Sequence, residues 1–245
     1  MMLLALALVL VGGAYAALAP TSAQADELAN ADPSKGEQLF LTNCATCHGP
    51  GAVGGDLAPS LIGVGAASVH FQVVTGRMPM QANAPQAEAK PPQFTEEQAL
   101  DLAAYIATLG PGPSIPSSEQ VDPTLGSPSN GMLLFRTNCA MCHNAVGAGG
   151  ALTEGKYAPS LMESTPTVIY EAMLTGPQSM PGFNDATLSP EEKRDIIAFL
   201  VEQRGTQPGG LSLGSLGPVS EGLWVFVVGL GVLIGTAVWI GSRSS

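Results

Sequence analysis

Apolar side chains recur at every third or fourth position in two stretches of the chain that lie about ninety residues apart. They are Leu102, Tyr105, Ile106 and Leu109 in the first stretch, and Ile196, Phe199 and Leu200 in the second. This spacing places them on one face of an α-helix, which can then be buried. We therefore predict one amphipathic helix in each stretch.

Polar residues mark the ends of both predicted helices. Capping-box spacing is found in Thr95 with Gln98 and in Ser189 with Glu192. Pro190 stands at a first helical position, where its missing N–H costs nothing, and Gly110 and Gly205 follow as stop signals. A shorter helix is predicted before each of two cysteine pairs. The stretches in between are rich in Gly and Pro and are predicted to be loops.

A long uncharged segment runs from Gly222 to Ser242. At about 1.5 Å per residue it can cross a hydrocarbon core about 30 Å thick. Trp224 and Trp239 lie near its ends, as interfacial aromatics do, and Arg243 is the charge that the positive-inside rule keeps in the cytoplasm. We predict a transmembrane helix over 221–242, with the preceding chain on the outer side of the cell membrane.

The first 25 residues are also uncharged, and the apolar run from Met1 to Leu18 is close to the minimum length for a membrane helix. Ala23 and Ala25 have the small-x-small spacing that signal peptidase cuts. Residues 1–25 are therefore predicted to be either a signal peptide or an N-terminal membrane anchor.

Four sequence blocks occur twice in the same order. The pairs are "LFLTNCATCH" with "LFRTNCAMCH", "APSL" with "APSL", "TGRMP" with "TGPQSMP", and "DLAAYI" with "DIIAFL". Such recurrence predicts two homologous domains, at 34–110 and 128–205. Linkers at 111–127 and 206–220 join the domains to each other and to the transmembrane helix.

The charge composition argues against a nucleic-acid-binding function. The formal net charge is -11 and only 12% of the residues are charged. Nine Lys and Arg residues cannot easily supply the basic surface that nucleic acid requires, so we predict no nucleic-acid partner.

The sequence Cys-x-x-Cys-His is the attachment signature of a c-type haem, in which both thiols form thioethers and the histidine binds the iron. It occurs twice, as Cys44, Cys47 and His48, and as Cys139, Cys142 and His143. In a zinc site shared by two such cysteine pairs, the pairs are usually about 15 to 20 residues apart. Here the two pairs are roughly ninety residues apart, which argues against a shared zinc site. Redox-active pairs or local disulfides would leave the histidines unexplained. Two covalently attached haems are predicted.

Each iron needs a sixth ligand or keeps an open position. Met78 and Met180 occupy matching "TG…MP" contexts after the two histidines, and Met80 is a rival to Met78. The third histidine, His70, has Tyr170 as its counterpart and is predicted to be a local polar or packing residue. We therefore predict His/Met ligation, which raises the reduction potential and leaves no vacant iron.

These blocks give each repeat a resemblance to class I cytochrome c domains, so the predicted fold is mostly α. In that family the first and last helices cross, which pairs Phe40 with the Tyr105 helix and Phe135 with the Phe199 helix. The resemblance also implies that the carbonyls of Pro59 and Pro159 accept hydrogen bonds from the two ligand histidines.

The whole arrangement resembles the dihaem cytochrome c subunit of the actinobacterial cytochrome bc complex. The stretches "SLIGVGAASVHFQVVTGRMP", "GKYAPSL", "AMLTGPQSMP" and "EGLWVFVVGLGVLIGTAVWIG" carry the likeness. It implies cytochrome b and Rieske iron–sulfur subunits as partners, and electron relay from menaquinol oxidation to an aa-type oxidase. No catalytic residue is predicted, so enzyme activity would belong to the assembly, a quinol:cytochrome c oxidoreductase.

Two other functions remain open from sequence. The chain could be the cytochrome c subunit of another dehydrogenase or oxidase, which differs only in its partner. It could also be a dihaem peroxidase-type enzyme, which would need one iron with an open or weak ligand position.

Overall fold

A computed structural model describes residues 26–82, 84–205 and 218–243. These described residues form two compact units, one from residues 26–81 together with Glu88–Ser118, and one from the described part of 82–87 together with those from Glu119 onward. The predicted signal peptide or anchor at 1–25 and most of the linker at 206–220 lie outside the described residues. The described part is mostly helical, as predicted.

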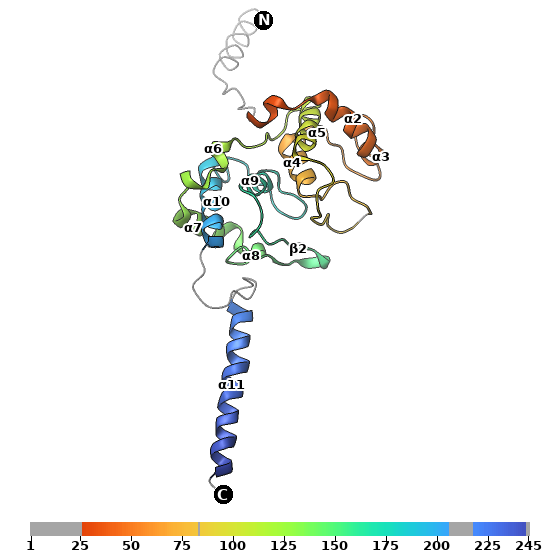
Figure 1. The fold of residues 1–245 in the computed structure, drawn as a ribbon. Helices are drawn as coiled ribbons and strands as arrows, with labels where there is room; N and C mark the ends of the chain where they lie inside the picture. The colour runs from red at the N-terminus through yellow and green to blue at the C-terminus, as the bar shows by residue number, and fades with distance from the viewer. Residues whose placement is uncertain (1–25, 83, 206–217, 244–245) are drawn as a thin grey trace, which may run out of the picture. The chain divides into compact units, whose positions relative to one another are not determined.

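The first unit is built from helices that pack on α5. Its elements are η1 (Asp26–Asn30), α2 (Pro33–Asn43), α3 (Ala45–His48), α4 (Gly65–Val74) and α5 (Glu96–Thr108). Figure 1 shows α2 and α4 beside α5. The rings of Phe40 on α2 and Tyr105 on α5 lie with centroids 5.5 Å apart, and both are buried. This confirms the predicted crossing of the first and last helices.

The second unit repeats this arrangement. Its elements are α6 (Ser118–Val121), η2 (Pro123–Leu125), α7 (Pro128–Asn138), α8 (Ala140–His143), β1 (Gly150–Ala151), η3 (Thr153–Gly155), β2 (Tyr157–Ala158), α9 (Pro166–Thr175) and α10 (Pro190–Gly205). Helix α7 packs along α10, and the rings of Phe135 and Phe199 are 5.4 Å apart. The strands β1 and β2 form a two-stranded antiparallel ribbon that pairs Gly150 with Ala158.

Both predicted capping boxes are present. The Thr95 hydroxyl accepts from the Gln98 backbone N–H while the Gln98 side chain accepts from the Thr95 N–H. Ser189 and Glu192 make the same pair of bonds at the start of α10. Helix α5 stops just before Gly110, but Gly205 is the last residue of α10, where we had expected it to follow the helix.

Both helix crossings depend on a glycine that the sequence patterns did not single out. A Cβ at Gly36 would lie 2.6 Å from the backbone carbonyl carbon of Asp101 on α5 and 2.9 Å from Tyr105 Cβ. A Cβ at Gly131 would lie 2.9 Å from the backbone nitrogen of Ile196 on α10. Real Cβ contacts are longer than this, so only glycine lets each pair of helices approach as closely as it does.

The prediction that loops fill the middle of each repeat was wrong, because α4 and α9 lie there. Helix α4 begins after Val64, which makes no side-chain cap, and it starts Gly-Ala-Ala, so it has no start signal. Helix α9 does carry readable signals, with Thr165 accepting from the Val168 N–H and Gly176 in the left-handed conformation at its end.

The C-terminal helix α11 spans Pro218–Arg243. Its segment Gly222–Arg243 is long and apolar enough to cross a membrane, with a mean hydropathy of 2.3 and none of that stretch buried inside the protein. Its apolar side chains are exposed, which fits the predicted membrane anchor.

Candidate haem sites

Each cysteine pair lies on a single helical turn that follows directly from the preceding helix. Cys44 ends α2 and opens α3, and the His48 N–H donates to the Cys44 carbonyl over 3.0 Å. Cys139 has the same place between α7 and α8, with the His143 N–H 2.9 Å from its carbonyl oxygen. One turn therefore presents two sulfurs and one imidazole from the same short segment.

All four cysteines are free thiols. Burial, followed by the neighbouring Cys47, raises the pKa of Cys44 to about 11. Burial and then Cys142 raise the pKa of Cys139 to about 11. Both thiols are therefore protonated at neutral pH.

The two histidines are fixed in one orientation by proline carbonyls, as the family resemblance implied. His48 Nδ1 lies 2.8 Å from the Pro59 oxygen, and His143 Nδ1 lies 3.0 Å from the Pro159 oxygen. A carbonyl oxygen only accepts, so Nδ1 carries the proton in each ring. The lone pair is then on Nε2, the nitrogen available to a metal.

Tight loops bring these prolines back to the histidines. The Gly54 N–H donates to the His48 carbonyl over 2.9 Å, and the Gly149 N–H donates to the His143 carbonyl over the same distance. Both glycines have positive φ, +79° and +85°, and a Cβ on either would meet the backbone around the following proline. The sequence analysis missed both, although a glycine recurring at the same place after each Cys-x-x-Cys-His could have revealed them.

The two histidines differ in burial, since His48 is half-buried and His143 is buried. Burial lowers the pKa of His143, although its hydrogen bond to Pro159 acts in the opposite direction. A lowered pKa keeps the imidazole neutral, which is the form that binds a metal.

The predicted methionine ligands lie in the loops that follow α4 and α9. Met78 is half-buried, and its N–H donates to the Gln72 carbonyl on α4 over 3.0 Å. Met180 is half-buried against the core of the second unit, and its N–H lies 3.0 Å from the Pro177 oxygen. Met80 is also half-buried, so burial does not separate it from Met78.

His70 has the local role that was predicted for it. It is buried on α4, and its Nε2 lies 2.7 Å from the Glu96 carboxylate at the start of α5. Its counterpart Tyr170 is buried too, and the Tyr170 hydroxyl accepts from Gln120 over 3.1 Å.

The donor set of each unit fits a covalently attached haem. Two neighbouring thiols are free to form thioethers, the imidazole is oriented with its lone pair on Nε2, and a half-buried thioether stands in a later loop. In residues 26–82, 84–205 and 218–243 no cluster of three or more His, Cys, Asp or Glu side chains could hold a metal ion instead.

Comparison with known families identifies the class. The family model described as "Cytochrome C oxidase, cbb3-type, subunit III" matches the chain twice, at residues 31–106 and 126–200. The chain belongs to this class of c-type cytochromes and carries two cytochrome c domains. Such domains imply covalently bound haem c and a role in electron transfer.

Full-length relatives narrow the assignment. A "Cytochrome bc1 complex cytochrome c subunit" of Corynebacterium efficiens is 51% identical over 86% of this chain and 77% of the relative. The protein of the same description from Mycobacterium tuberculosis H37Rv is 46% identical over 99% of this chain and 90% of the relative. The chain therefore belongs to the family of cytochrome bc1 complex cytochrome c subunits.

A more distant similarity covers part of the chain. A "Cbb3-type cytochrome c oxidase subunit FixP" of Sinorhizobium medicae is 30% identical over 47% of this chain and 40% of the relative.

Proposed function

We propose that this chain is a membrane-anchored dihaem cytochrome that relays electrons within a menaquinol-oxidising cytochrome bc complex and onward to an aa-type oxidase. Electrons would come from the Rieske centre. The observation that carries the proposal is the pair of Cys-x-x-Cys-His turns, each with its histidine bonded to a proline carbonyl. The relatives that match most of the chain are cytochrome c subunits of cytochrome bc1 complexes, which supports such a complex as its setting.

We propose that Cys44, Cys47 and His48 hold one haem, with Met78 as the sixth ligand. Haem iron supplies reversible one-electron transfer when bound. The chain's own part is to fix the ligands. The Pro59 carbonyl orients the imidazole of His48, and the backbone bond from Met78 to Gln72 holds the start of the methionine loop.

The second domain would hold its haem in the same way. Cys139, Cys142 and His143 would attach it, Pro159 would orient the histidine, and Met180 would be the sixth ligand. Two methionine-closed irons favour electron transfer over binding of oxygen or peroxide, because neither leaves a position for a substrate.

The proposed domains span 34–110 and 128–205, with linkers at 111–127 and 206–220. We place both on the outer side of the cell membrane, anchored by the helix at 221–242. Cytochrome b and the Rieske protein are the proposed subunit partners. The similarity to a FixP subunit over 47% of the chain makes an oxidase subunit the second candidate, but it covers only about half of what the bc1-complex relatives cover.

The test is purification of the tagged chain from its native membranes in mild detergent, followed by reduced-minus-oxidised optical spectra. The proposal expects b-type and a-type haem bands to accompany the c-type band in a fixed ratio. An a-type band without a b-type band would favour the oxidase subunit. A c-type band alone would refute relay between the two complexes.

A further inference from the structure

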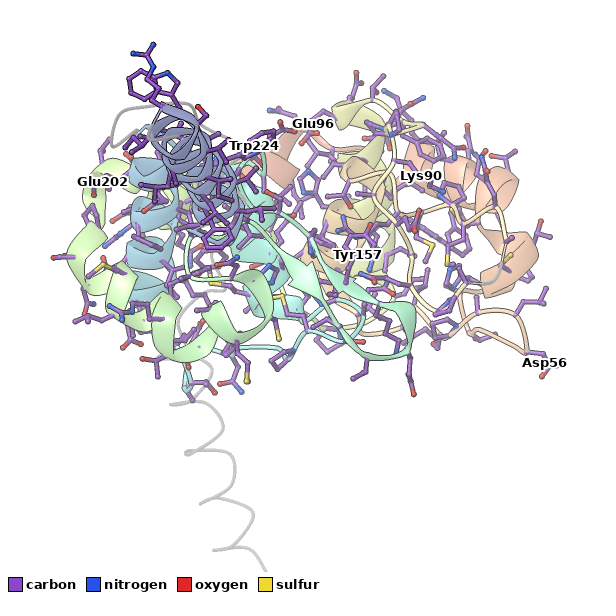
Figure 2. All side chains as sticks on the ribbon, turned by 90° about the horizontal axis from the view of Figure 1, so that it is seen from below. Asp56, Lys90, Glu96, Tyr157, Glu202 and Trp224 are labelled. Atoms are coloured by element: carbon purple, nitrogen blue, oxygen red, sulfur yellow. The ribbon has the colours of Figure 1, made fainter. Side chains whose placement is uncertain are left out.

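A lysine holds the methionine loop of the first domain. The loop segment from Thr75 to Pro79 carries Met78, and Lys90, which is labelled in Figure 2, bonds to both ends of this segment. The Lys90 N–H donates to the Thr75 carbonyl over 3.2 Å, and its ammonium Nζ donates to the Pro79 carbonyl over 3.3 Å. The backbone of Lys90 also packs so closely on Gly76 that a Cβ there would overlap the Lys90 carbonyl. Lys90 thus meets the loop on both sides of Met78.

The positive charge of Lys90 is not offset by the group that it bonds to. The Lys90 side chain is half-buried, and its ammonium donates to the neutral Pro79 carbonyl and not to a carboxylate. Glu88, the nearest acid along the chain, is exposed, so water screens its charge.

The second domain lacks this arrangement. Pro181 and Gly182 approach Gly176 where Lys90 and Pro91 approach Gly76, and the loop from Gly176 to Asn184 contains no charged residue. The buried Lys193 lies near this loop's end, but its ammonium is 2.7 Å from the Asp185 carboxylate, which compensates the charge.

We propose that Lys90 tunes the first haem site electrostatically, so that the first domain has the higher reduction potential of the two. The inference rests on the proposed His48 and Met78 ligation. Taking up one electron lowers the charge of the site by one, so a fixed positive charge nearby favours the reduced state. Electrons shared between the two domains would then rest on the first.

Potentiometric titration of the purified full-length chain tests this proposal. Lys90→Gln removes the charge and keeps a side-chain donor for the Pro79 carbonyl, whereas Lys90→Arg keeps the charge. Lys35→Gln is the matched control, because Lys35 belongs to the same unit, its side chain is 61% exposed, and its partner Glu97 is exposed as well. A Met78→His variant identifies which of the two c-type waves belongs to the first domain.

Lys90→Gln should lower the equilibrium constant for reduction of the first-domain haem by on the order of tenfold. For a one-electron couple, a tenfold change corresponds to a potential lower by about 59 mV. Lys90→Arg and Lys35→Gln should leave that potential in place. No shift in Lys90→Gln, or equal shifts in Lys90→Gln and Lys90→Arg, would overturn the electrostatic role.

The near-infrared absorption band of methionine-ligated ferric haem separates this inference from the proposed function. A wild-type chain with fewer than two attached haems, or without that band, would refute the proposed ligand set itself. An intact band in Lys90→Gln together with an unmoved potential would refute only the role of Lys90. Loss of the band in Lys90→Gln would show that Lys90 acts by holding the loop, which also overturns the electrostatic role.

Discussion

Replacing Gly36 by alanine tests the helix crossing that builds the first domain. Helix propensity alone favours the change, because alanine in a helix interior is about 1 kcal/mol better than glycine. The structure predicts the opposite sign. The added Cβ would lie 2.6 Å from the carbonyl carbon of Asp101, whereas ordinary contact begins at 3.4 Å.

The Asp101 carbonyl oxygen would lie closer still to the added Cβ, so the two helices would have to separate by at least about 0.8 Å, the difference between these two distances. A gap of about 0.5–1 Å forfeits roughly a quarter to a half of the dispersion energy of each contact it opens. The buried ring pair of Phe40 and Tyr105 lies at this crossing. Overpacking should cost about 3 kcal/mol. The gain in helix propensity of about 1 kcal/mol reduces this cost, so the free energy of unfolding should fall by about 2 kcal/mol.

Denaturant unfolding of the detergent-solubilised chain, followed by circular dichroism, measures this loss as a lower midpoint at unchanged slope. Gly55→Ala is the matched control, since a Cβ at Gly55 has no atom within 4 Å and should change stability by less than about 0.5 kcal/mol. Gly131→Ala should repeat the effect in the second domain. A Gly36→Ala chain as stable as the wild type, or more stable, would refute the reasoning.

Three further predictions concern the haem sites and the second core. Met78→His or Met180→His should lower the potential of that domain's haem, because His/Met ligation raises it; a redox titration without a shift would discard the ligand. Replacing both Cys139 and Cys142 by alanine should leave one attached haem per chain by intact mass, and two would contradict the attachment site. Lys193→Met should lower the free energy of unfolding by about 1–3 kcal/mol, because it removes the donor to the buried Leu188 carbonyl. An unchanged midpoint in denaturant unfolding would show that this hydrogen bond does not stabilise the domain.

The sequence was informative where the chemistry is local. Capping boxes predicted α5 and α10 because both partners of each bond lie within four residues. The Cys-x-x-Cys-His turns are equally local, since one helical turn places all three side chains.

Features that depend on distant packing were harder to predict. Gly36 and Gly131 look like poor helix residues until the facing helix is known to lie against them. Helix α4 was missed because tertiary burial, not capping, stabilises it. Its His70, Phe71 and Val73 are buried in the first unit. Nothing in the sequence around Lys90 indicates that its side chain reaches the Pro79 carbonyl, because the loop between them is irregular.

The central claim is that the chain carries electrons on two haems whose irons are both closed by methionine. The most direct measurement is the optical spectrum of the fully reduced, purified chain before and after carbon monoxide is added, with the haem content counted in the same sample. The account predicts two haems per chain and no change in the c-type bands. A carbon monoxide-induced shift would mean that an iron is open, and the dihaem enzyme would then replace the electron relay as the better explanation.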